Sequence, residues 1–102
     1  MSFRPVGSID DFPEGRAVEV RVGARQIAVF CVDGELFALK NICPHQAVLL
    51  HHLPPRDGRA VCKGHGWEFD LRTGQCLRGK TDQRVAVYPV KVEDGTVYVD
   101  VG

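Results

Sequence analysis

The sequence predicts an all-β protein, on three observations. Valines alternate with polar residues in several short runs, as at Val18, Val20 and Val22. This period of two is typical of a strand with one buried face. Pairs such as Asp33-Gly34 and Thr73-Gly74 punctuate the apolar runs and are typical of hairpin turns. Finally, no stretch shows a convincing helix of three turns.

The first half of the chain reads as a scaffold of strands. The run Ile27–Val32 is apolar at every position, which predicts a central strand that is buried on both faces. Asp33-Gly34 follows as a tight turn, and Leu36–Leu39 returns as the next strand. Cys31 lies inside the central strand, where we interpret it as a small buried hydrophobe.

The last third also predicts strands. Thr73-Gly74 turns the run Leu71–Leu77, which carries Cys76, interpreted as packed and unligated. The valine rows that follow predict a meander with one face inward. Its strands are expected at Val85–Pro89, Pro89–Val92 and Thr96–Val101, with Asp94-Gly95 as the final turn.

The middle of the chain, residues 46–61, is less regular. Leu49-Leu50 is expected to pack beneath a loop, and Asp57-Gly58 forces a turn before a short strand at Ala60-Val61. His51 and His52 are adjacent, and neighbouring side chains of an extended segment cannot both face one site. We therefore interpret both as solvated loop residues.

Length and composition exclude several classes of function. A chain of 102 residues with 44% hydrophobic content predicts one domain with a modest core. A formal net charge of zero argues against binding to nucleic acid through phosphate contacts. We expect no membrane association and no export, because no apolar run approaches 18 residues and no signal-like segment follows Met1. The cysteine usage fits a cytoplasmic protein better than a disulfide framework.

Two short motifs carry the chemistry. Cys43 and His45 form Cys-x-His, and Cys62 and His65 form Cys-x-x-His after a gap of sixteen residues. Two thiols and two imidazoles can hold a zinc ion as a closed tetrahedral site. The same four ligands can hold a two-iron, two-sulfide cluster, with the thiolates on one iron and the imidazoles on the other. The ligand chemistry alone leaves both open.

The complete pattern resembles the Rieske family. Cys43-Pro44-His45, Cys62 to His65, and the continuation His-Gly-Trp-x-Phe-Asp are the matching motifs, and the resemblance covers nearly the whole chain. It implies one [2Fe-2S] cluster per chain, with Cys43, His45, Cys62 and His65 as its ligands. It also implies stacked antiparallel sheets, with residues 1–102 as a single domain and a cluster-binding subdomain at one tip, at approximately 42–80.

The residues beside the ligands predict a low reduction potential. High-potential members of the family have an extra cysteine in each loop and two hydroxyl donors to cluster sulfurs. Val48 and Gly64 stand in place of those cysteines here, and Trp67 and Phe69 stand in place of the donors. Without the donors the reduced cluster is less stabilised, so we expect a midpoint on the order of −150 mV, the low end of the Rieske range. We expect Trp67 to pack under the second loop.

The resemblance also implies a function. The site leaves no open coordination position and no nucleophile paired with a base, so we expect an electron carrier and no enzyme. Ferredoxins of this size pass electrons from a flavin-containing NAD(P)H reductase to a terminal oxygenase that hydroxylates aromatic rings during aromatic hydrocarbon catabolism. We expect transient contacts with both partners and a monomeric carrier. The alternatives are the small subunit of an assimilatory NADH-dependent nitrite reductase and a zinc-stabilised interaction module.

Charge placement favours an acidic partner. Residues 56–84 contain seven Lys or Arg and four Asp or Glu, which gives +3, so the remainder of the chain must carry −3. A basic cluster half would steer an acidic redox partner toward the ligand loops, with association slowing as salt rises. The alternative is that these charges are scattered over a solvated surface.

Overall fold

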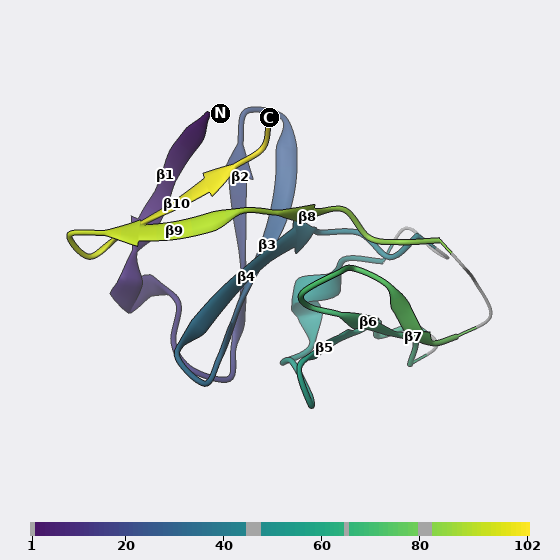
Figure 1. Ribbon diagram of the computed structural model, residues 1–102. Coiled ribbons are helices and arrows are strands. Elements are labelled where there is room, and N and C mark those ends of the chain that lie inside the picture. The colour runs from purple at the N-terminus through teal and green to yellow at the C-terminus, as the bar shows by residue number, and fades with distance from the viewer. Residues whose placement is uncertain (1, 45–47, 65, 80–82) are drawn as a thin grey trace.

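The computed structural model describes residues 2–44, 48–64, 66–79 and 83–102. Within these residues the chain forms three antiparallel sheets and two short 3-10 turns, so the predicted all-β class is confirmed (Figure 1). No helix in this part of the chain is long and apolar enough to cross a membrane.

Sheet A joins the two ends of the chain. Its strand order is β1 (Phe3–Ser8), β10 (Thr96–Asp100) and β9 (Val90–Glu93). The ends of β1 and β10 therefore lie side by side, as Figure 1 shows for the two termini. A 3-10 turn, η1 (Ile9–Asp11), follows β1 and begins with a capping box between Ser8 and Asp11.

Sheet B is the middle layer. Its order is β2 (Ala17–Val22), β3 (Arg25–Val32), β4 (Glu35–Lys40) and β8 (Val87–Tyr88). Alternate residues of β3 enter two different cores. Ile27 and Val29 pack with the valines of β10, whereas Ala28 and Phe30 pack on the opposite side. This confirms the predicted central strand and explains why it is apolar at every position.

Sheet C forms a separate small layer from residues 59–78. It consists of β5 (Arg59–Val61), β6 (Glu68–Asp70) and β7 (Cys76–Arg78). Phe69 packs against Phe30 and Leu39 of sheet B, together with Leu50 from the second 3-10 turn, η2 (Leu50–His52). Burial of these side chains attaches sheet C to the middle layer.

The three Asp-Gly pairs form turns, as predicted. In each pair both residues have a positive φ, which is the requirement of a type I′ hairpin turn. The values are 53° and 76° at Asp33-Gly34, 54° and 71° at Asp57-Gly58, and 51° and 77° at Asp94-Gly95. Local sequence therefore determined these hairpins.

The predicted C-terminal meander is confirmed only in part: β9 and β10 pair across the Asp94-Gly95 turn, but the strand before them does not join their sheet. The segment expected as a strand at Val85–Pro89 contributes only β8, which pairs with β4 in sheet B, and the third strand of sheet A is β1. Two features explain why the segment before Pro89 does not join sheet A. Val85 N–H donates to the Gly74 carbonyl of the β6–β7 turn at 2.9 Å, and Pro89, which lacks an N–H, marks the crossing from sheet B to sheet A. Val92 of β9 extends past the core and is 46% exposed.

Candidate metal centre

The structure brings the two predicted sulfur ligands into one core. Cys43 follows β4 and Cys62 follows β5, and both are buried in the same packed cluster as Leu50 and Phe69. Neither cysteine is in a disulfide. The two predicted imidazole ligands, His45 and His65, lie outside the described residues.

Each cysteine begins a loop that is closed in the same way. Cys43 N–H donates to the Val48 carbonyl at 2.8 Å, and Cys62 N–H donates to the Trp67 carbonyl at 2.7 Å. Both bonds span five residues. His45 lies in sequence within the first closed segment, and His65 lies within the second. Each predicted imidazole thus belongs, in sequence, to a segment whose two ends are joined by a backbone hydrogen bond.

This donor set fits a metal centre. Two thiols from separate loops share one apolar core, where an uncompensated thiolate would be costly. A metal ion or iron–sulfur cluster compensates that charge, since thiolates are its ligands. An imidazole two residues after Cys43 and another three residues after Cys62 would complete a two-sulfur, two-nitrogen set.

Asn41 holds the first loop in place. Its side chain is buried, and its oxygen accepts from His51 N–H at 3.0 Å. Its nitrogen donates to Glu19 Oε2 at 2.8 Å and lies 2.9 Å from His51 Nδ1. The Asn41 amide therefore links the segment after β4, which leads into the loop that begins at Cys43, to η2, which follows that loop. It also links both to strand β2.

The interpretation of His51 as a solvated loop residue is wrong, because its ring and its backbone N–H both bind Asn41. The Asn41 nitrogen is a donor, so His51 Nδ1 accepts and the ring proton lies on Nε2. His52 is exposed, as expected, with its ring centroid 4.6 Å from that of His51.

Glu68 lies at the base of the second loop. Its side chain is 6% exposed and contacts three guanidinium groups, those of Arg56, Arg59 and Arg78. The hydrogen bond from Arg56 is the main cause that holds the pKa of Glu68 below its ordinary value. The carboxylate is therefore ionised and fixed where β6 begins.

Trp67 packs as expected, half-buried against the core that contains both cysteines. Gly79 makes room for it, because a Cβ at this position would lie 2.6 Å from Trp67 Cδ2 and 3.0 Å from Cys76 Sγ. Cys76 also packs against this core. A side chain at position 79 would thus push the Trp67 ring away from its place beside the second loop.

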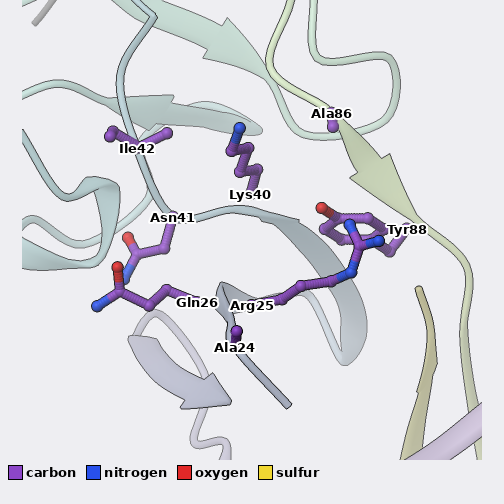
Figure 2. Close-up of a pocket in the computed structure, with 8 residues that line it drawn as sticks. All are labelled: Ala24, Arg25, Gln26, Lys40, Asn41, Ile42, Ala86 and Tyr88. Atoms are coloured by element: carbon purple, nitrogen blue, oxygen red, sulfur yellow. The ribbon is translucent and has the colours of Figure 1, made fainter. Parts of the chain in front are cut away.

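A cleft of about 420 Å³ lies beside the segment that leads into the first loop (Figure 2). Arg25 and Lys40 contribute cations, and Gln26 and Asn41 contribute amides. The residues that line the cleft include no carboxylate, thiol or imidazole. The remaining lining residues are Ala24, Ile42, Ala86 and Tyr88.

Sequence reasoning missed Asn41 and Glu68 as supports of the two loops. A signal existed for Asn41, a polar residue that follows an apolar strand and stands two positions before Cys43. For Glu68 the sequence held no such signal, because its three arginine partners come from different elements.

Comparison with known proteins identifies the family. The family model of the Rieske [2Fe-2S] domain matches residues 2–89. The chain therefore belongs to the Rieske family. It is 36% identical to the anthranilate 1,2-dioxygenase ferredoxin subunit of Burkholderia cepacia, over 98% of this chain and 93% of that protein.

Solved Rieske structures share the fold. The Sphingomonas yanoikuyae B1 ferredoxin superposes with a TM-score of 0.91 at 28% identity, covering 99% of this chain and all of that one. A chain from the complex of reduced oxygenase and oxidised ferredoxin in carbazole 1,9a-dioxygenase gives a TM-score of 0.87 at 28% identity, with coverages of 95% and 91%.

Family membership decides the cofactor and the class of function. The chain carries a Rieske-type [2Fe-2S] cluster, which excludes the zinc alternative. Its relatives are ferredoxin components, so this Rieske protein is an electron carrier and not itself the catalyst.

Proposed function

We propose that Cys43, His45, Cys62 and His65 are the four ligands of the cluster. Two observations on the described residues support this ligand set. Cys43 and Cys62 share one core, and a backbone hydrogen bond joins each of them to a residue five positions later, beyond the predicted histidine. We further propose that residues 1–102 form one Rieske domain, with residues 42–80 as its cluster-binding part.

The cluster supplies one-electron chemistry, and the chain determines where that electron can leave. Leu50, Ala60 and Phe69 pack around the two cysteines and exclude water from the sulfur side. Neutral imidazole ligands leave the oxidised cluster with zero net charge, which raises the potential relative to an all-thiolate cluster. Because this core is packed, we expect a cluster held by these residues to exchange its electron at the ligand loops and not through the core.

The function that we propose is transfer of single electrons from a flavin-containing NAD(P)H reductase to a terminal ring-hydroxylating oxygenase, in the cytoplasm. The observation that carries it is full-length similarity to a dioxygenase ferredoxin, over 98% of this chain. The carbazole 1,9a-dioxygenase complex, whose ferredoxin has this fold, supports direct contact with an oxygenase. We expect a monomer that binds both partners transiently.

Stopped-flow mixing tests the proposal. The dithionite-reduced protein should pass one electron per chain to an oxidised terminal oxygenase, and NADH with a flavoprotein reductase should reduce the protein again. In size-exclusion chromatography it should elute as a free monomer of about 11.3 kDa. Permanent association with a large reductase subunit, with no transfer to an oxygenase, would contradict the proposal and favour the nitrite reductase alternative.

A further inference from the structure

Three arginines converge on one buried carboxylate beside the second ligand loop. Arg56 Nη2 lies 2.9 Å from Glu68 Oε2, and Arg59 Nη1 lies 3.1 Å from Glu68 Oε1. Arg78 Nη1 lies 3.6 Å from Glu68 Oε2. We call Arg56, Arg59 and Arg78 the arginine platform.

The backbone beneath the platform is fixed by hydrogen bonds. Arg56 and Arg59 face each other across the Asp57-Gly58 turn, and each N–H donates to the other's carbonyl at 3.0 Å. Arg78 lies directly opposite Glu68 in the β6–β7 ladder. Arg56 therefore comes from a tight turn, and Arg59 and Arg78 come from β5 and β7, the two strands that flank β6. Glu68 of β6 orients their guanidinium groups.

The platform carries more charge than Glu68 can compensate. Three guanidinium groups against one carboxylate leave an excess of +2. The carboxylate is already paired by the contacts at 2.9 and 3.1 Å, so its burial does not require Arg78. The side chains of Arg56, Arg59 and Arg78 are 62%, 38% and 71% exposed, so this charge faces solvent.

Two acidic residues that are close in sequence to the platform, Asp57 and Asp70, line a different part of the surface. Asp57 and Asp70 line a separate cavity with Glu35 and Arg72. Asp70 Oδ1 accepts from Arg72 N–H, and Glu35 pairs with the Arg72 guanidinium at 2.9 Å. Among the described residues, Glu68 is the only carboxylate with an ion pair to the platform.

We propose that the arginine platform is the surface on which a carboxylate-rich face of the electron-transfer partner docks. The inference rests on the proposed function, and its basis is charge complementarity and position. Glu68 follows Trp67, whose carbonyl closes the loop that begins at Cys62, so the platform adjoins that loop. A partner held there lies next to the cluster, and electrostatic attraction accelerates its arrival.

Small redox probes test the charge of this surface directly. The reduced protein would be mixed with tris(oxalato)cobaltate(III), an anion that accepts one electron from the cluster and becomes cobalt(II). At about 10 mM ionic strength, Arg56→Gln and Arg78→Gln should each slow this reaction roughly two- to fivefold. Glu68→Gln, which raises the excess charge to +3, should accelerate it by a similar factor. With the cationic oxidant hexaamminecobalt(III), the two arginine variants should instead react faster than wild type, and Glu68→Gln should react more slowly.

A polyanion then tests the docking of carboxylates. Poly-L-glutamate should slow oxidation of the wild-type protein by the anionic probe, because it occupies the platform, and should have a weaker effect on Arg56→Gln and Arg78→Gln. Arg21→Gln is the matched control, since Arg21 is an exposed arginine on β2, outside sheet C. It removes the same charge and should leave both reactions within about 1.5-fold of wild type.

The outcomes separate this inference from the proposed function. The docking inference is overturned if the Arg56→Gln and Arg78→Gln proteins contain the cluster but are oxidised by the probes at the same rates as Arg21→Gln. The platform would then be only a structural ion pair. These two exposed positions keep the test valid even if Glu68→Gln does not fold. A wild-type protein without a redox-active cluster would overturn the proposed function as well.

Discussion

Asn41 shows how one residue can fix a ligand loop without touching the metal. Its amide satisfies groups of β2 and η2, and it precedes Cys43 by two positions. Asn41→Ala would leave the His51 backbone N–H unpaired and remove a donor from Glu19. We expect this to destabilise the protein by about 1–3 kcal/mol, as is usual for unsatisfied buried polar groups.

The measurement for Asn41→Ala is the urea concentration at which the visible absorbance of the bound cluster disappears. Gln26→Ala is the control, because the Gln26 side chain donates to the same Glu19 oxygen at a longer 3.2 Å, whereas the hydrogen bonds to His51 come from Asn41. We expect a clearly lower urea midpoint for Asn41→Ala than for Gln26→Ala. Equal midpoints would mean that Asn41 does not support the loop.

The residues around the cysteines also predict the potential. Positions 67 and 69 hold Trp and Phe, so neither can donate a hydroxyl hydrogen bond to the reduced cluster. We expect a midpoint on the order of −150 mV, within the Rieske range of roughly −150 to +300 mV. A redox titration followed by electron paramagnetic resonance measures it. A value above about +100 mV would show that other donors supply the missing stabilisation.

At the scale of elements, the ion pairs of sheet C should make stability depend on pH. The Arg56 hydrogen bond, followed by that of Arg59, holds the pKa of Glu68 below its ordinary value of 4.5 in the folded protein. The folded state therefore binds the proton more weakly than the unfolded state. The stabilisation is complete above the unfolded pKa and is lost as pH falls through the lower, folded pKa.

We therefore expect Glu68→Gln to be less stable than wild type at pH 7, with a difference that shrinks as pH falls below 4.5. Denaturation in urea at several pH values, followed by the fluorescence of Trp67, the single tryptophan, measures this difference. Glu35→Gln removes an exposed partner of Arg72 and should have little effect at any pH. A difference independent of pH would rule out the ionised carboxylate as its source.

The contact between the β6–β7 turn and the segment before β8 depends on Gly74. A Cβ at Gly74 would lie only 1.9 Å from the Val85 carbonyl oxygen, and the residue has a φ of +76°. Gly74→Ala should therefore separate the two segments and cost more than about 2 kcal/mol in urea denaturation. Gly23→Ala has a similar φ of +61° but open space around it, so it should cost only about 1–2 kcal/mol. Equal costs would contradict the close approach.

The elements that sequence predicted well are those determined by neighbouring residues. Asp33-Gly34 and Asp57-Gly58 formed the expected turns because a type I′ turn needs only two adjacent residues that tolerate positive φ. The destination of β8 was not predictable in the same way. Pairing of Tyr88 with Ala38 joins residues 50 positions apart, and the alternation of valines carries no information about which strand is adjacent.

In the candidate site too, features set by neighbouring residues were predicted, and features set by tertiary contacts were not. Cys43 and Cys62 could be chosen from spacing alone, and the structure places both in one core. The Asn41–His51 contact and the arginines around Glu68 depend on tertiary approach, so a buried polar residue in the sequence looked the same as a solvated one. His45 and His65 remain predicted ligands.

At the scale of the molecule, three layers separate the tasks of the protein. Sheet A closes one side of sheet B, and the opposite side of sheet B supports sheet C and both cysteine loops. The arginine platform around Glu68 carries an excess of positive charge beside the second loop, although the chain as a whole has a formal net charge of zero. The fold thus places the two cysteines and this positive charge on the same side of sheet B.

The most direct test of the central claim is chemical analysis of the purified protein for iron, acid-labile sulfide and zinc. We expect two iron and two sulfide per chain, as required if two thiolates and two imidazoles hold one [2Fe-2S] cluster. Stoichiometric zinc in a protein without labile sulfide would contradict it.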